Sequence, residues 1–142
     1  MRYSHTQTGY PALVGLLIPL IFFIHSYLKG RLGIDWPMVL ILLLAMILFV
    51  SLTVSITLTH LELRYWMGFI TLRFPLSEIV SCRVVNTGWA WGIHITKNGW
   101  LYNVSGFRGV EIVTNKGKTY QVGSDEPEKL ADALREACGF TA

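Results

Sequence analysis

The apolar residues of this chain are concentrated in two long runs in its N-terminal third. Residues 12–28 carry no formal charge, and a second run of similar length covers residues 36–52. Runs of this length are at the lower limit for a helix that crosses the ~30 Å hydrocarbon core of a membrane. The pattern predicts a transmembrane hairpin of two helices, at about 10–28 and 36–52, preceded by a polar tail at residues 1–9.

Aromatic residues stand at the ends of both runs. Tyr10 and Tyr27 flank the first run and Trp36 opens the second, which are positions where amphipathic rings contact lipid headgroups. His25 is the titratable side chain inside these runs. It could act as a proton relay or a ligand, but its neighbours at the end of the run favour a place in the interfacial layer.

The periodicity changes near residue 50. From there, apolar residues alternate with Ser and Thr through residue 59, which is typical of a half-buried strand. Further short alternating or apolar segments follow as far as residue 122 and predict about seven antiparallel strands. Residues 61–65 continue the alternation of the first strand, and the further expected strands lie at residues 69–74, 78–85, 93–97, 100–104, 110–114 and 118–122.

Two turn signals and one helix signal organise the C-terminal half. Asn98-Gly99 predicts a two-residue type I′ turn, because both residues tolerate positive φ. A second hairpin is expected over residues 115–117. Asp125 as N-cap with Glu128 three residues later predicts a capping box at the start of a final amphipathic helix, which Gly139 ends. This helix places an apolar face toward the core: Leu130, Ala133, Leu134, Ala137 and Cys138.

This order of elements resembles the bacterial pleckstrin-homology-like (bPH) membrane proteins. The resemblance is carried by GWLYNVSGFRGVEI (99–112) and YQVGSDEPEKLADAL (120–134), and more loosely by residues 61–79. It implies an α+β PH-like domain over residues 53–142, a bent antiparallel sheet or open barrel with one C-terminal helix. Phosphoinositide binding is not carried over, because the first hairpin supplies only Arg64 and Arg73 as basic residues.

Charge and cysteine content narrow the class of protein. The net charge is +3, and from residue 53 onward basic and acidic residues nearly balance, which argues against nucleic acid as a partner. Cys82 and Cys138 form no ligand or disulfide pattern and are expected in the core, in a reducing compartment. Together with the apolar runs, this predicts an integral protein of the inner (cytoplasmic) membrane with its PH-like domain in the cytoplasm.

No pattern of catalytic residues stands out. His60, Glu62 and His94 lack the spacing of a metal site, and no metal, cofactor or small-molecule ligand is indicated. Tryptophans in turns and loops are more informative: they could enter the membrane interface, anchor a protein contact, or simply pack in the core. The candidate interaction surface consists of Trp66, Trp89, Trp91 and Arg108.

The function expected from these features is a membrane-anchored binding or assembly module without catalytic activity. Its expected partners are the lipid bilayer and either further copies of itself or another membrane protein. The alternative is an accessory or regulatory subunit of a membrane enzyme or transporter, docking through Trp89 and Trp91.

Overall fold

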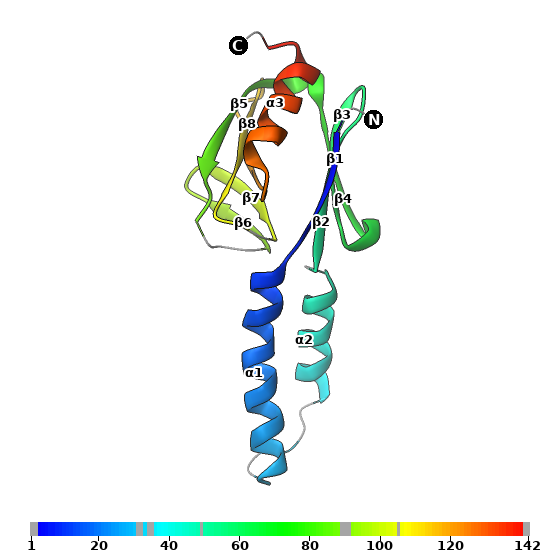
Figure 1. Cartoon of the computed structure of the whole chain (residues 1–142), viewed down its shortest axis with the longest axis vertical. Helices are drawn as coiled ribbons and strands as arrows, with labels where there is room; N and C mark the ends of the chain where they lie inside the picture. The colour runs from blue at the N-terminus through cyan, green and yellow to red at the C-terminus, as the bar shows by residue number, and fades with distance from the viewer. Residues whose placement is uncertain are drawn as a thin grey trace.

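The computed structural model describes residues 3–30, 33, 36–48, 50–88, 92–104 and 106–140. In this part of the chain, strands form two sheets and two helices extend from one end of the sheets (Figure 1). A third helix packs between the two sheets. The helices are α1 (Tyr10–Leu28), α2 (Trp36–Leu48) and α3 (Pro127–Cys138), with short 3₁₀ turns η1 (Trp66–Gly68) and η2 (Leu76–Glu78). The strands are β1 (Tyr3–Thr8), β2 (Ser51–Ile56), β3 (His60–Tyr65), β4 (Ile70–Pro75), β5 (Ile79–Asn86), β6 (Gly92–Thr96), β7 (Gly99–Asn103), β8 (Arg108–Thr114) and β9 (Thr119–Gly123).

The first sheet has the order β1-β2-β3-β4 and is antiparallel throughout. Strand β1 pairs with β2 from Tyr3↔Ile56 to Thr8↔Ser51, so the helical hairpin is inserted between two neighbouring strands. The residues expected to form a polar tail therefore include an edge strand. Its sequence, YSHTQT, is polar on both faces. Apolar alternation, the pattern that predicts a strand, is therefore missing from this segment.

The second sheet has the order β5-β8-β9-β7-β6. Its pairs are antiparallel except β7 and β9, which run parallel with Trp100 opposite Tyr120. The expectation of about seven antiparallel strands in one bent sheet is therefore wrong: the described residues form four strands in one sheet and five in the other. Sequence periodicity reports which side chains are buried but not which strands are neighbours.

The core lies between the two sheets and is closed by α3. Leu130, Ala131 and Leu134 of α3 are at most 1% exposed, and the helix contacts β2, β5 and β8. This confirms the apolar face expected for the last helix and adds Ala131 to it. Both cysteines are free and belong to or pack against this core, as expected.

The predicted transmembrane hairpin is wrong in its second helix. The apolar run ends in β2, because the strand alternation begins at Ser51, so α2 stops at Leu48 and has 13 residues. A helix of that length is about 20 Å long, shorter than the ~30 Å core of a bilayer. Over the described residues, neither α1 nor any other helix combines the length and apolar character that a crossing requires. The predicted localisation, integral to the inner membrane with a cytoplasmic domain, is therefore not supported.

The expected type I′ turn at Asn98-Gly99 is displaced by one residue. Thr96 pairs with Gly99, so Lys97 and Asn98 form the loop and positive φ falls on Gly99. The Thr96 hydroxyl stabilises this loop: it accepts a hydrogen bond from the Asn98 backbone N–H (3.2 Å) and donates to the Gly99 carbonyl (2.9 Å).

The capping box expected before α3 is also wrong. The N-cap residue is Glu126, no side chain caps the helix, and Pro127 is the first helical residue. Upstream, the Ser124 hydroxyl accepts a hydrogen bond from the Glu126 backbone N–H (3.0 Å). At the other end, Gly139 adopts φ +72° and ends the helix as expected.

Candidate functional site

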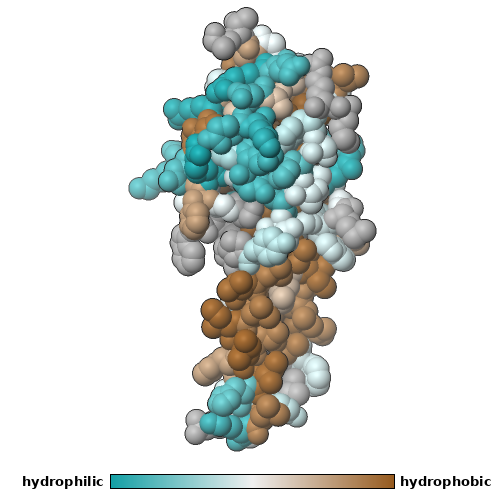
Figure 2. Space-filling view, viewed as in Figure 1, coloured by the Kyte–Doolittle hydropathy of each residue, from teal (hydrophilic) through white to brown (hydrophobic). Residues whose placement is uncertain are grey.

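The helical hairpin exposes apolar side chains over most of its surface. On α1, half-buried residues recur at the spacing of one helix face, Leu13, Leu16, Leu20 and Phe23, which is the contact expected with α2. The remaining faces carry large exposed side chains. They include Ile18 (66%), Phe22 (69%) and Ile41 (68%). Figure 2 shows this surface as a continuous apolar column below a mainly hydrophilic β domain.

A cationic pocket lies on the outer face of the first sheet, next to the η1 turn between β3 and β4. It has a volume of about 530 Å³ and is lined by Arg64, Gly68, Thr71 and Arg73. Strand register places these side chains together, because Arg64 is opposite Thr71. Gly68 adopts φ +98°, and its missing side chain leaves the corner open.

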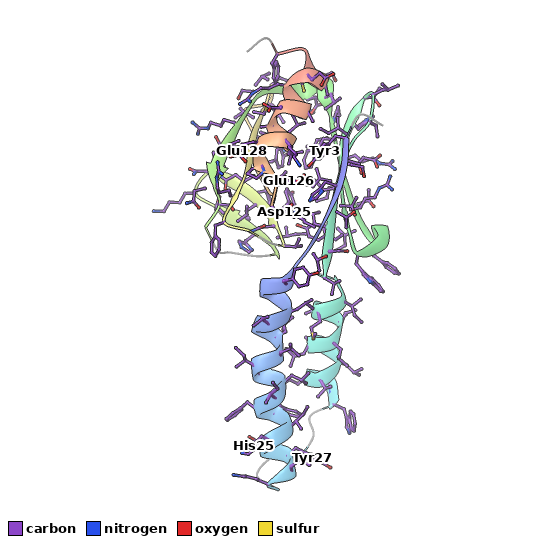
Figure 3. All side chains as sticks on the ribbon, viewed as in Figure 1. Tyr3, His25, Tyr27, Asp125, Glu126 and Glu128 are labelled. Carbon is purple, nitrogen blue, oxygen red and sulfur yellow. The ribbon has the colours of Figure 1, made fainter. Side chains whose placement is uncertain are left out.

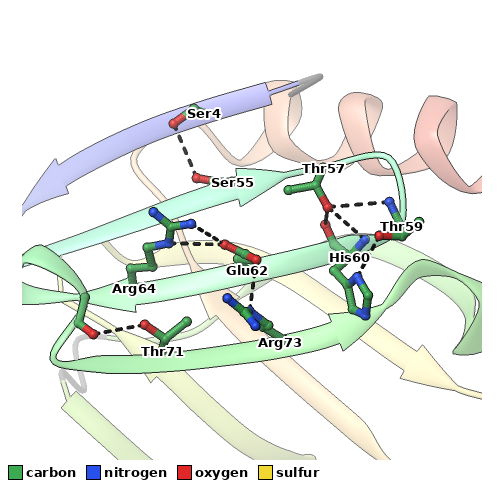
Figure 4. A network of polar contacts seen from close by, with 10 residues as sticks. Ser4, Ser55, Thr57, Thr59, His60, Glu62, Arg64, Thr71 and Arg73 are labelled. Carbon is green, nitrogen blue, oxygen red and sulfur yellow. Dashed lines mark hydrogen bonds and ion pairs between the residues drawn. The ribbon is translucent and has the colours of Figure 1, made fainter.

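Glu62 holds both arginines of this pocket (Figure 4). Its Oε2 accepts hydrogen bonds from Nε (3.1 Å) and Nη2 of Arg64, and its Oε1 lies 3.0 Å from Nε of Arg73. The hydrogen bond from Arg64 is the main cause that lowers the pKa of this carboxyl below 4.5. One carboxylate thus serves two guanidinium groups, and the pocket keeps an excess positive charge.

Two stacked aromatic side chains, Trp66 and Phe69, which we call the aromatic step, lie beside this pocket. Trp66 stacks on Phe69 with ring centroids 4.5 Å apart, and the Phe69 side chain is 73% exposed. Trp66 has φ +34°, an unfavourable value for a non-glycine residue. The η1 turn lies at the end of the β domain from which the helices emerge (Figure 1).

A second pocket, of about 190 Å³, follows the seam between β4 and the second sheet. Phe74 of β4 meets Tyr120 of β9 there, with ring centroids 4.7 Å apart. Lys116 and Lys118 line the same pocket, and Lys116 Nζ lies 2.7 Å from Oε1 of Glu78. Arg73 lines both pockets, so they form one cationic track along β4.

Polar contacts join the edge strand β1 to the segment between the end of β9 and the start of α3. Nε2 of Gln7, which is buried, donates a hydrogen bond to the Gly123 carbonyl (2.6 Å). Nε2 of His5 lies 2.8 Å from Oδ1 of Asp125. Tyr3 lies close to the same acidic residues (Figure 3), and burial together with the charges of Glu126 and Asp125 raises its pKa to about 12. The contact between β1 and α3 thus closes one side of the two-sheet domain.

Of the four residues predicted as an interaction surface, the structure describes Trp66 and Arg108. Trp66 stacks on Phe69, whereas Arg108 at the start of β8 forms an ion pair with Glu128 of α3. Trp89 and Trp91 lie outside the described residues. Sequence reasoning missed Lys118 and considered Glu62 only as a metal ligand. Glu62 and Arg64 share one face of a strand at i and i+2, a signal present in the sequence, but their meeting with Arg73 depends on the β3–β4 register.

The described side chains do not form a site for a metal ion. Among these residues, no group of three or more His, Cys, Asp or Glu could hold one. His60 Nδ1 lies 2.7 Å from the Thr59 hydroxyl, and the two carboxylate oxygens of Glu62 are occupied by arginines. The chemistry that these pockets offer is recognition of negative charge next to aromatic surface.

The fold and these surfaces define a two-sheet β domain with a C-terminal helix and an inserted apolar hairpin. Comparisons with protein-family models, with curated proteins and with solved structures found no match to this chain. The resemblance to bacterial PH-like proteins therefore stays an expectation.

Proposed function

We propose that this protein is a non-catalytic binding and assembly module whose apolar hairpin contacts the acyl chains of a lipid bilayer. The proposal concerns contact with lipid, and no crossing of the bilayer is part of it. The observation that supports it is the exposure of large apolar side chains on α1 and α2 away from their mutual contact. Exposed apolar surface of this extent marks a protein or membrane contact.

The distribution of these side chains favours lipid over a protein partner. A protein partner covers one face of a hairpin, whereas lipid surrounds it. The exposed apolar residues lie on both helices and on several faces of α1. Tyr10, Tyr27 and Trp36, at the ends of the helices, are all exposed, and rings of this kind prefer the headgroup region.

The test is flotation of the full-length protein with phosphatidylcholine vesicles. A double variant, Ile18→Glu with Ile41→Glu, places one charge on each helix at side chains that are 66% and 68% exposed. The matched control is Leu58→Glu, which changes a 73% exposed apolar residue in the loop between β2 and β3, away from the hairpin.

We expect the parent protein and the control variant to float with the vesicles and the double variant to stay in the dense fractions. Burying each isoleucine contributes about 2 kcal/mol, so two charges should reduce partitioning by more than tenfold. If the parent protein does not float but forms a discrete oligomer that the double variant disrupts, the hairpin is a protein-assembly surface and the lipid proposal is wrong.

The second candidate function is an accessory or regulatory subunit that docks on another protein. The Trp66–Phe69 stack favours this alternative, because Phe69 is exposed and aromatic rings at an accessible position are typical of interface anchors. Phe69→Ser should then abolish stoichiometric co-purification of the partner while leaving vesicle flotation unchanged.

A further inference from the structure

The free edge of β4 is a position where another strand could be added. In the described part of the first sheet, β4 is the last strand and pairs with β3 alone. It runs over six residues, Ile70–Pro75, a length of about 20 Å at the usual rise of a strand. An unpaired edge of this kind can bind an extended peptide through backbone hydrogen bonds.

The charge along this edge is positive. Four cationic side chains line the two pockets along β4, and only two carboxylates of the described part of the chain oppose them. These are Glu62, which pairs with the arginines, and Glu78, which pairs with Lys116. Of the cations, Lys118 has no ion-pair partner among the described residues, and its side chain is exposed. A ligand that follows β4 would therefore pass from the guanidinium groups near η1 to the lysines at the β8–β9 turn: Arg64, Arg73, Lys116 and Lys118.

The two faces of β4 present different chemistry to such a ligand. Arg73 lies on the outer face with Glu62, whereas Phe74 points into the seam and meets Tyr120 of β9. Tyr102 lies behind these rings, 6.1 Å from Phe74. Because side chains of an added strand alternate between the same two faces, acidic residues would face the arginines and apolar residues would face the aromatic rings.

We propose that the β4 edge binds an extended peptide segment in which acidic and apolar residues alternate. Its backbone pairs with β4, its carboxylates meet the cationic track, and its apolar side chains cover the Phe74–Tyr120 contact. This binding site goes beyond the proposed function and does not depend on contact between the hairpin and lipid, because the hairpin and the β4 edge are separate surfaces (Figure 1).

The probe is a labelled, end-blocked peptide with three Glu-Val repeats, titrated with the full-length protein in mild detergent and followed by fluorescence anisotropy. Saturable binding that weakens between about 50 mM and about 500 mM salt is expected, because exposed charge pairs are screened. No binding at the lower salt concentration would overturn the proposal.

Two comparisons separate this site from general attraction between charges. Lys118→Glu should weaken peptide binding by about fivefold or more at low salt, whereas Lys29→Glu, the same charge change at the far end of the hairpin, should leave it unchanged. Equal losses in the two variants would overturn the proposal. Both side chains are exposed, so neither substitution disturbs the core.

Backbone pairing is tested with a peptide of the same sequence that is N-methylated at every residue, so that the N–H groups on both edges of the strand are removed. Methylation removes hydrogen-bond donors and keeps the charges, so the proposal predicts that binding is lost. Equal affinity for the methylated peptide would refute strand addition. If the protein instead binds inorganic phosphate or anionic vesicles in a Lys118-dependent way and ignores the peptide, the track recognises a small anionic group and the peptide proposal is wrong. The double variant Ile18→Glu with Ile41→Glu should keep its affinity for the peptide, which distinguishes the peptide site from the proposed contact between the hairpin and lipid.

Discussion

Replacing Gly99 tests whether β7 and β9 approach each other as closely as the structure indicates. Gly99 has φ +114°, and a Cβ atom added there would lie 2.0 Å from the Thr119 carbonyl oxygen and 2.8 Å from its carbonyl carbon. Both obstacles belong to the backbone, so no change of side-chain rotamer relieves them. Strand β7 would have to move away from β9, which disturbs the parallel pairing of Trp100 with Tyr120.

The expected cost of Gly99→Ala has two parts. A non-glycine residue at this φ costs about 1–3 kcal/mol, and forced displacement of packed backbone adds about 1–3 kcal/mol, so we expect a loss of about 4 kcal/mol. Gly117→Ala is the matched control. Gly117 also has positive φ (+73°), but a Cβ atom there would meet nothing within 4 Å. This variant should lose only about 1 kcal/mol.

Equilibrium denaturation of the full-length protein in mild detergent, followed by tryptophan fluorescence, measures both losses in free energy of unfolding. The difference between the two variants combines the close approach of β7 to β9 with the larger backbone strain at the φ of Gly99 (+114°). If Gly99→Ala and Gly117→Ala lose equal stability, the parallel contact between these strands is not as tight as described and the strand order of the second sheet is in question.

Three further changes probe the contacts that hold the candidate surfaces. Glu62→Gln should lower the thermal midpoint of unfolding at neutral pH. Because the folded-state pKa of Glu62 is lowered from 4.5, its carboxylate stabilises the fold above pH 4.5, and this stabilisation is lost as the pH falls through the folded-state pKa. The thermal midpoints of the parent protein and the variant should therefore converge in acid, and the exposed Glu136→Gln is the control. Gln7→Leu leaves the Gly123 carbonyl without its 2.6 Å hydrogen bond and should cost about 1–3 kcal/mol in chemical denaturation, whereas Thr6→Val, on the exposed side of β1, should stay within about 0.5 kcal/mol. Leu134→Ala empties a fully buried position under α3 and should cost about 2–5 kcal/mol by the same measurement; a loss below about 1 kcal/mol would mean that α3 does not pack on the sheets.

Strong local patterns in the sequence predicted much of the β domain and the last helix. The alternation at Leu52, Val54 and Ile56 predicted a strand whose three apolar residues are at most 3% exposed. The bounds of α1 match the apolar run from Tyr10 to Leu28. Where a local pattern and the tertiary structure agree, sequence alone identifies the element.

The failures have a common physical cause, which is dependence on partners distant in sequence. β1 has no apolar alternation and exists because β2 pairs with it, and the parallel β7–β9 pair joins segments whose local signals are both ordinary hairpins. The candidate site shows the same limit. Glu62 gathers Arg64 from its own strand and Arg73 from the next, and Lys118 reaches the β4 edge from the other sheet.

Spin labels placed around the hairpin test contact with lipid most directly. Cysteine variants at exposed positions on both helices, Ile18→Cys and Phe22→Cys on α1 and Leu40→Cys and Ile41→Cys on α2, each carry one nitroxide in vesicle-reconstituted protein. Labelling the parent protein sets the background from Cys82 and Cys138. We predict that all four labels are accessible to oxygen and shielded from a polar nickel reagent, because oxygen concentrates among acyl chains and the nickel reagent stays in water. Labels on one face that are shielded from both reagents would indicate a protein partner, and labels open to nickel would indicate water; either result would contradict the account.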